Sequence, residues 1–246
     1  MHSSPAKSPT RAIFWDIDGT LLVTGRAGMI GWERAFAAVS DGAPFPAVRP
    51  DGLTDYQIAA WLLGHGGGPA EPGDDVQAAA AALVGRYEEA LVDALPLRQG
   101  RVLDQVRPIL DWLSRERTEV LSWLVTGNTR AGGAAKLRHY GLASYFAAAG
   151  DAAGLAGAFA MRVEPRACIV RRALEQAQEA LPGLRPDEVL VIGDTPHDIE
   201  GAHAIGVPVL AVATNTHTLD ELAALGPWRA VATLPSPDEF ARLIGR

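Results

Sequence analysis

Residues 11–21 read Arg-Ala-Ile-Phe-Trp-Asp-Ile-Asp-Gly-Thr-Leu, an apolar run that passes directly into acidic residues and a glycine. The segment Arg11 to Trp15 has the length of a strand, and its lack of alternating polar positions is typical of a strand buried on both faces. The carboxylates of Asp16 and Asp18 follow at once, where that strand ends. This stretch therefore predicts a buried strand that stops at a functional loop.

Three more apolar runs have a similar form. They are Val120 to Val125, Glu188 to Ile192 and Val207 to Ala213. Helix-like segments lie between them, at Val102 to Ser114, Ala131 to Tyr140, Arg166 to Ala180 and Asp198 to Ala204. Strands that alternate with helices predict an α/β fold, with a parallel sheet covered by helices on both faces. Ligands bind beyond the carboxyl ends of the strands in such sheets, and polar residues follow these runs at those ends.

The stretch 22–98 breaks this alternation, because it contains helix-like segments and no convincing strand. The segments are Ile30 to Val39, Thr54 to Leu63 and Asp75 to Leu95, separated by Gly- and Pro-rich turns. We expect an all-helical module at 22–98, inserted into a core made of 11–21 and 99–246. Residues 1–10 are expected to form a flexible N-terminal tail.

Composition limits the class of protein. The formal charge of −7 argues against a broad basic surface for nucleic acid. The single cysteine, Cys168, offers no internal disulfide, and no apolar run approaches the roughly 20 residues that span a bilayer. The N-terminus lacks the apolar stretch of a secretory signal. We therefore expect a cytoplasmic protein, monomeric or homodimeric, with no nucleic-acid or membrane partner.

Asp16 and Asp18 form the first chemical motif. Two carboxylates two residues apart at a strand end lie side by side where the chain turns, and Gly19 permits a sharp backbone course there. One carboxylate can attack phosphorus and form an aspartyl-phosphate. The other can give a proton to the leaving group and later take one from water. A plain surface turn or a calcium loop is the structural alternative.

Thr126-Gly127-Asn128 forms the second motif, directly after the predicted strand Val120 to Val125. A threonine hydroxyl and free backbone N–H groups at a strand-to-helix turn can bind an anion. The alternative is that Thr126 or Asn128 serves only as the N-cap of the next helix.

Asp194 and Asp198 form the third motif, within Gly193-Asp194-Thr195-Pro196-His197-Asp198. Hard oxygen ligands suit Mg²⁺, which prefers one or two carboxylates together with phosphate. We expect Asp194 to bind the metal, and Asp198 to lie in its outer shell or to orient a basic residue. Stabilisation of the first helical turn is the alternative role for Asp198. His197 lies inside this motif and is more often a plain helix-turn side chain than a site residue.

Together, the order and strand-end positions of these three motifs resemble the haloacid dehalogenase-like hydrolase superfamily, from residue 11 to about 240. The short segment Gly52-Leu53-Thr54-Asp55 is similar to one that opens a cap helix in the phosphoglycolate phosphatase and β-phosphoglucomutase-like branch. The resemblance implies a Rossmann-like doubly wound core with a helical cap at 22–98.

The resemblance also implies residue roles. Asp16 would be the nucleophile and a metal ligand, and Asp18 the acid/base that binds Mg²⁺ through its carbonyl. Asp194 would complete the metal site. The phosphoryl group would be held by residues of the three motifs and a basic residue: Gly19, Thr126, Gly127, Asn128 and Arg166.

The choice of basic residue is less direct. In the family a lysine or arginine precedes the last acidic motif and neutralises the charge on nucleophile and phosphate. Lys136 follows the second motif too closely for this role. We therefore expect Arg166, which opens a predicted helix, with Arg162 as the competitor, because a cation is needed where several anions converge.

The function implied is Mg²⁺-dependent hydrolysis of a small organic phosphate monoester through an aspartyl-phosphate. Phosphotransfer to a sugar hydroxyl, as in a phosphomutase, uses the same core residues and stays open. A non-catalytic phosphate-binding regulator is the alternative of another class. Dehalogenase chemistry is disfavoured by the presence of Asp18, phosphonate cleavage by a cap without lysine, and a receiver domain by the length of the chain.

Overall fold

The protein is described here from a computed structural model, which covers residues 10–65, 72–148 and 151–245. Most of the predicted N-terminal tail lies outside these ranges. Thr10, which we had placed in the tail, is buried, and its N–H donates to the carbonyl of Ile244 at 2.9 Å. The ordered fold therefore begins at least one residue earlier than expected, and its first and last described segments lie side by side.

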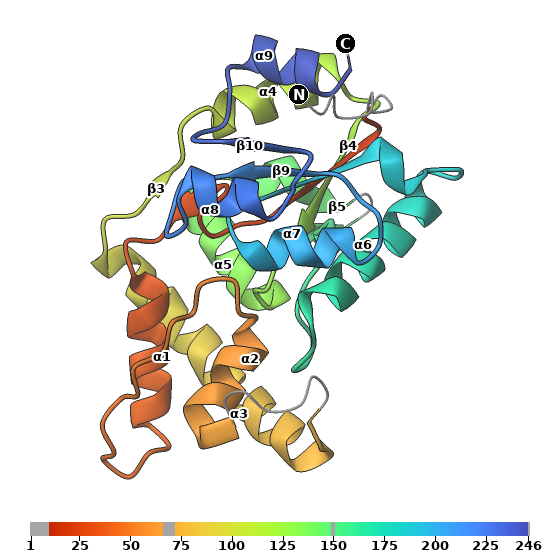
Figure 1. Ribbon diagram of the computed structural model, residues 1–246. Coiled ribbons are helices and arrows are strands. Elements are labelled where there is room, and N and C mark those ends of the chain that lie inside the picture. The colour runs from red at the N-terminus through yellow and green to blue at the C-terminus, as the bar shows by residue number, and fades with distance from the viewer. Residues whose placement is uncertain (1–9, 66–71, 149–150, 246) are drawn as a thin grey trace.

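A six-stranded sheet in the order β10-β9-β8-β1-β4-β7 forms the centre of the core (Figure 1). All of its neighbouring strands pair in parallel. The strands are β1 (Ala12–Trp15), β4 (Leu121–Val125), β7 (Gly157–Ala158), β8 (Val189–Gly193), β9 (Val209–Val212) and β10 (Arg229–Val231). The four predicted apolar runs are β1, β4, β8 and β9, so the parallel α/β core is confirmed.

The middle strand, β1, is buried along its whole length, with β8 on one side and β4 on the other. Its last residue, Trp15, is level with Ile192 of β8 and Leu124 of β4. Because parallel strands start and end in the same sense, the residues that follow β1, β8 and β4 meet at one edge of the sheet. Successive strands depart from β1 in opposite directions here, which is the position where doubly wound sheets bind ligands.

Helices cover both faces of the sheet. On one face, α4 (Val106–Glu116), α5 (Arg130–His139) and α9 (Pro237–Leu243) pack against side chains such as Trp15 and Leu124. On the other, α6 (Arg166–Ala180), α7 (Pro196–His203) and α8 (Leu219–Ala224) enclose a second apolar cluster around Phe14 and Val191. Because both faces are covered, the inner strands are continuously apolar, as the sequence indicated.

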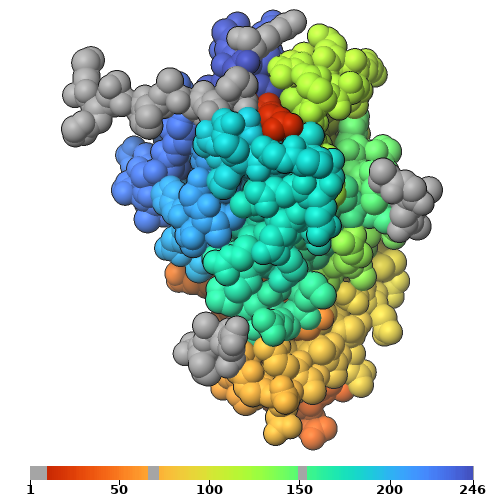
Figure 2. Space-filling view, turned by 90° about the vertical axis from the view of Figure 1, so that its right-hand side faces the viewer, coloured from red at the N-terminus to blue at the C-terminus, as the bar shows by residue number. Residues whose placement is uncertain are grey.

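The inserted segment forms helices α1 (Ala27–Ala37), α2 (Asp55–Ala60) and α3 (Asp74–Ala94), with a π-helical turn at Trp61–His65. These helices have an apolar cluster of their own, in which Trp32 and Tyr87 stack with ring centroids 3.9 Å apart. In Figure 1 they lie beyond the carboxyl ends of the strands, and Figure 2 shows them, coloured orange to yellow, at one end of the molecule. We call this helical segment the cap.

Several short elements were not expected. We predicted no strand in the inserted segment, but β2 (Leu22–Val23) lies there and pairs with β3 (Arg101–Val102), and α4 consequently begins later than predicted. A second small ribbon joins β5 (Ala147–Ala148) to β6 (Asp151–Leu155), and three 3₁₀ turns occur at Leu95–Leu97, Ala143–Phe146 and Pro186–Glu188. The strands β2, β3 and β5 have two residues each, which is too short for a period to be recognised in the sequence.

Within the described residues, no helix has both the length and the apolar character needed to cross a bilayer.

Candidate active site

Three loops meet at the carboxyl edge of the sheet. Asp16 follows β1, Thr126 follows β4 and Asp194 follows β8. The hydrogen bonds between neighbouring strands continue into these loops. The N–H of Asp16 donates to the carbonyl of Ile192 at 3.0 Å, and the N–H of Thr126 donates to the carbonyl of Ala158 at 3.2 Å. The backbone positions of the functional residues are therefore set by the sheet.

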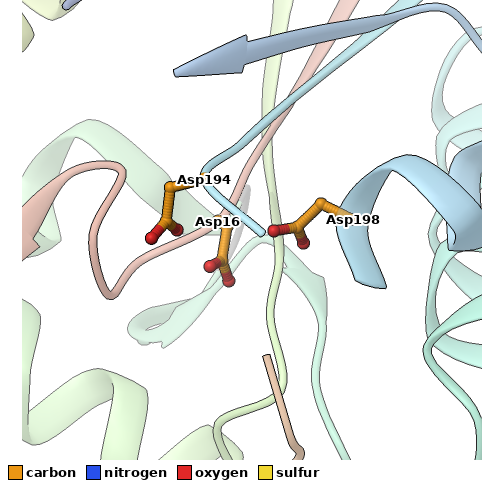
Figure 3. A group of neighbouring side chains, drawn as sticks. All are labelled: Asp16, Asp194 and Asp198. Carbon is orange, nitrogen blue, oxygen red and sulfur yellow. The ribbon is translucent and has the colours of Figure 1, made fainter. Parts of the chain in front are cut away.

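Three carboxyl groups gather at this edge, those of Asp16, Asp194 and Asp198 (Figure 3). One oxygen of each lies within 4.8 Å of the others, and all three side chains are buried. Burial raises the pKa of Asp16 to about 6, although the guanidinium of Arg166 lowers it. Burial and the charge of Asp16 raise the pKa of Asp194 well above its usual range. The metal-free cluster therefore disfavours the ionised carboxylates, and a bound cation would stabilise them.

The chain fits a metal ion at this point. Asp194 Oδ1 accepts from the Thr20 hydroxyl at 3.3 Å, while its Oδ2 is buried without a hydrogen-bond partner among the described residues. The Asp194 carboxylate packs directly against Gly19, because a Cβ there would lie only 2.1 Å from Oδ2. The φ of +76° at Gly19 also favours glycine. A buried carboxylate oxygen without a hydrogen-bond partner, in a set of hard oxygen donors, suits a divalent cation such as Mg²⁺.

Asp198 differs from the other two acids because both of its oxygens are engaged. Oδ1 accepts from Arg166 Nη2 at 2.5 Å, and Oδ2 accepts from the N–H and hydroxyl of Thr195 at 3.1 and 2.7 Å. The same residue therefore stabilises the first turn of α7 and orients a basic side chain. Both roles considered from the sequence occur together.

Arg166 lies in the site, as predicted. Its Nη2 is 2.8 Å from Asp16 Oδ1 and also donates to the carbonyl of Val125 at 3.3 Å, and its side chain is buried. The other terminal nitrogen, Nη1, faces Gly127. Arg162, the competitor, lies outside the site, with an exposed side chain 4.0 Å from Glu164.

Lys136, which we set aside as the cation beside the nucleophile, also lies at the site, where it contacts Asp18. Its Nζ donates to Asp18 Oδ2 and to Asn128 Oδ1, both at 2.6 Å, and the side chain is buried beside the cavity. Side chains on a helix point back toward its N-terminus, so a residue in the second turn of α5 reaches the loop that precedes the helix. The site therefore has two buried cations, one beside each aspartate of the first motif.

Asp18 is held apart from the acidic cluster. Lys136 and the Asn128 amide, 2.8 Å away, both donate to its Oδ2, and 39% of its side chain is exposed. Its carboxylate is thus fixed at the edge of the cavity rather than among the candidate metal ligands. The predicted metal contact through its carbonyl stays a prediction.

Neither Thr126 nor Asn128 caps the next helix. The N-cap of α5 is Thr129, whose side chain accepts from the N–H of Gly132. Thr126 Oγ1 accepts two hydrogen bonds, from the Asn128 N–H at 3.2 Å and its side-chain amide at 2.8 Å. A hydroxyl has two lone pairs and one proton, so Thr126 is left to donate. We call residues 126–129 the phosphate loop, after the role predicted for its first three residues.

A cavity of ≈ 340 Å³ lies between this edge and the cap. The core side is lined by the predicted site residues Asp16, Asp18, Gly19, Thr126, Gly127, Asn128, Arg166 and Asp194, joined by Lys136, Thr195 and Asn215. The cap adds apolar side chains such as Met29, Trp32 and Ile58 and the polar residues Arg26, Asp51 and Asp55. His197 is not among the lining residues and packs against Gly52 of the cap. Asp198 lies behind the cavity wall.

Comparison with known proteins agrees with this geometry. The family model described as haloacid dehalogenase-like hydrolase matches residues 10–206. The chain belongs to the haloacid dehalogenase-like hydrolase family. It is an enzyme of the hydrolase class by that membership, and the family resemblance drawn from the three motifs is confirmed. In the sequence comparison, no curated protein matches the chain.

Solved structures show the same fold at low identity. A family IA, variant 3 hydrolase of this family from Entamoeba histolytica is 18% identical, with a TM-score of 0.68 over 96% of this chain and 100% of its own. A haloacid dehalogenase-like family hydrolase from Streptococcus pneumoniae is 18% identical, with a TM-score of 0.61 over 95% and 98%. CbbY from Rhodobacter sphaeroides, solved with phosphate, is 17% identical, with a TM-score of 0.65 over 91% and 94%.

Proposed function

We propose that this hydrolase is a Mg²⁺-dependent phosphatase that cleaves a small organic phosphate monoester through an aspartyl-phosphate on Asp16. The observation that carries the proposal is the convergence of Asp16, Asp194 and Asp198 beside an orphaned Asp194 oxygen and a donating Thr126 hydroxyl. The ≈ 340 Å³ cavity lies at the lower end of the range for small-molecule sites, which favours a small metabolite.

Metal binding would involve Asp16, Asp194 and the carbonyl of Asp18, with Asp198 behind them. A bound divalent cation supplies positive charge for the phosphoryl oxygens and for the crowded carboxylates. Arg166 supplies a second positive charge and holds Asp16 in a fixed orientation at 2.8 Å. Phosphoryl transfer depends on such positioning and charge stabilisation, since the transferring group needs little covalent help.

In the first step, a carboxylate oxygen of Asp16 bonds to phosphorus as the ester P–O bond breaks. Asp18 gives its proton to the departing alkoxide oxygen, which leaves as an alcohol. Lys136 and Asn128 hold Oδ2 of Asp18, so Oδ1 is the oxygen available for proton transfer. The Thr126 hydroxyl donates to a phosphoryl oxygen.

In the second step, Asp18 removes a proton from water as the water oxygen bonds to phosphorus. The bond between phosphorus and Asp16 breaks, and inorganic phosphate leaves. Asp18 is again protonated and Asp16 is again a carboxylate, so the cycle closes. The enzyme needs no other co-substrate.

The test measures phosphate release from p-nitrophenyl phosphate with Mg²⁺ or with a chelator. We expect Asp16→Asn to lose at least about 10³-fold in kcat while keeping its fold, and mass spectrometry of acid-quenched wild type to find phosphate on the peptide that contains Asp16. Asp93→Asn, at an exposed position in the cap, is the matched control. Near-wild-type activity of Asp16→Asn would refute the nucleophile assignment.

Product analysis separates the remaining alternatives. A phosphomutase would return an isomeric sugar phosphate with little free phosphate, and a binding protein would release none. We also propose a cytoplasmic location, since the lone Cys168 gives no internal disulfide.

A further inference from the structure

Asp55 joins the cap to the phosphate loop. It is the first residue of α2 and is 5% exposed. Its Oδ2 accepts from the N–H of Thr129 at 2.7 Å, and its own N–H donates to the carbonyl of Gly127 at 2.8 Å. One cap residue therefore makes two hydrogen bonds to a loop that belongs to the core.

These two bonds fix consecutive peptide groups. The carbonyl of Gly127 belongs to the peptide that carries the Asn128 N–H, and the Thr129 N–H belongs to the next one. Peptide groups are planar, so fixing these two peptide groups also fixes the direction of the Asn128 N–H. That N–H donates to Thr126 Oγ1. The orientation of the Thr126 hydroxyl thus depends on a contact made by the cap.

The side chain of Asp55 is not occupied in capping its own helix. Thr54 does this, since its hydroxyl accepts from the Gln57 N–H at 3.1 Å and its N–H donates to the Gln57 side chain at 2.9 Å. This reciprocal pair fixes the start of α2. The carboxylate of Asp55 is consequently free to reach the core from a rigid base.

The backbones of the cap and the loop also touch directly. A Cβ at Gly127 would lie 3.0 Å from the Leu53 carbonyl oxygen and 3.1 Å from the Thr54 Cα, so a larger residue would push the two apart. A second cap helix contributes Glu88, which accepts from the Thr129 hydroxyl at 2.5 Å. Several contacts therefore seat the cap on the same short loop.

Keeping a carboxyl group at this position is costly. Burial raises the pKa of Asp55 to about 7, although Lys136 and the Thr129 N–H lower it, and the charges of Asp18 and Glu88 raise it further. A neutral side chain would avoid this penalty. The hydrolysis steps above do not use Asp55, so its cost is unexplained by that chemistry.

We propose that Asp55 is a positioning residue that holds the phosphate loop in its phosphate-binding geometry from the cap side. This inference rests on the proposed function, since it assigns phosphate binding to that loop. The phosphate site is then complete only when α2 is seated on the core. Asp55 itself does not touch the reacting atoms.

Two conservative variants separate acceptor geometry from charge. Asp55→Asn keeps an acceptor oxygen in place and removes the charge, whereas Asp55→Glu keeps the charge and displaces the acceptor. Calorimetric titration of each protein with inorganic phosphate, in the presence of Mg²⁺, measures the loop without turnover. Asp93→Asn and Asp93→Glu, at an exposed position on α3, are the matched controls.

We expect Asp55→Asn to bind phosphate within about threefold of wild type and Asp55→Glu to bind about tenfold more weakly, the scale of one lost hydrogen bond. KM for the substrate should rise in parallel with the phosphate Kd. Wild-type affinity in Asp55→Glu, or a larger loss in Asp55→Asn than in Asp55→Glu, would overturn the inference. A wild type that binds phosphate but hydrolyses no ester would instead refute the proposed function.

Discussion

Binding of Mg²⁺ is expected to stabilise the fold, and Asp194→Asn is expected to remove that effect. Two ionised carboxylates 4.8 Å apart, the outer limit for the cluster, repel by about 3.5 kcal/mol at an effective dielectric constant of 20. Arg166 compensates Asp16 and Asp198, but Asp194 Oδ2 is left without a partner among the described residues. In the metal-free protein this repulsion, together with burial, disfavours the ionised form of Asp194, and a bound cation would relieve it.

The size of the effect follows from binding linkage. At a free Mg²⁺ concentration of 100 times its Kd, stabilisation is about 2.7 kcal/mol. For a chain of 246 residues this corresponds to a rise in Tm of roughly 5 to 10 °C. In Asp194→Asn the rise should vanish, because one ligand is lost. Without metal, the variant should be at least as stable as wild type, because an amide avoids the cost of ionising a buried carboxyl group at this position.

The assay is thermal unfolding followed by circular dichroism, with a chelator or with Mg²⁺ up to millimolar concentration. Asp93→Asn removes an exposed carboxylate from the cap and should keep the full Mg²⁺ response. The reasoning is refuted if wild type shows no Mg²⁺-dependent rise in Tm, or if Asp194→Asn rises as much as wild type. A variant less stable than metal-free wild type would show that repulsion is not the dominant force at this position.

Three further predictions concern single residues. Gly19→Ala places a Cβ 2.1 Å from Asp194 Oδ2 at a φ of +76°. The free energy of unfolding measured in urea should therefore fall by about 1–2 kcal/mol, and calorimetry should show weaker Mg²⁺ binding. Unchanged Mg²⁺ affinity would contradict this expectation. Lys136→Met removes a hydrogen-bond donor from Asp18 and should lower kcat by about 10²-fold. Steady-state kinetics measures kcat, and a value close to that of wild type would refute this expectation. Because the folded pKa of Asp55 is about 7 against an ordinary 3.8, folding retains its proton and the stability from this group falls as pH rises from about 4 to 7. Between pH 5 and 7 the stability of wild type relative to Asp55→Asn should therefore fall by about 2 kcal/mol, and parallel pH curves would rule out the raised pKa.

The strand-end motifs were predictable because their signals are local. Asp16, Thr126 and Asp194 each follow a mainly apolar run, and parallel strands bring such ends together whatever the details of the helices. Arg166 could be chosen because it opens a helix between the second and third motifs. For these residues, position along the chain was enough to place the side chain near the site.

Contacts across the fold were not predictable. Lys136 was set aside as the active-site cation because it follows the second motif closely. The sequence alone does not show that its side chain points back along α5 to the preceding loop. The sequence analysis included Asp55 only as the last residue of the segment Gly52-Leu53-Thr54-Asp55, because its partner, the Thr129 N–H, is 74 positions away. The strands β7 and β10 are too short to show a period, and their pairing depends on the strands that they extend.

The contacts at Thr129 bear on how freely the cap can be exchanged between relatives. Its N–H and hydroxyl are both satisfied from the inserted segment, by Asp55 and Glu88. A chimera that received a foreign insertion of equal length but without acids at these two places would leave the start of α5 to solvent. A foreign insertion would therefore fit this core only if it supplied two acceptors at the positions of Asp55 and Glu88.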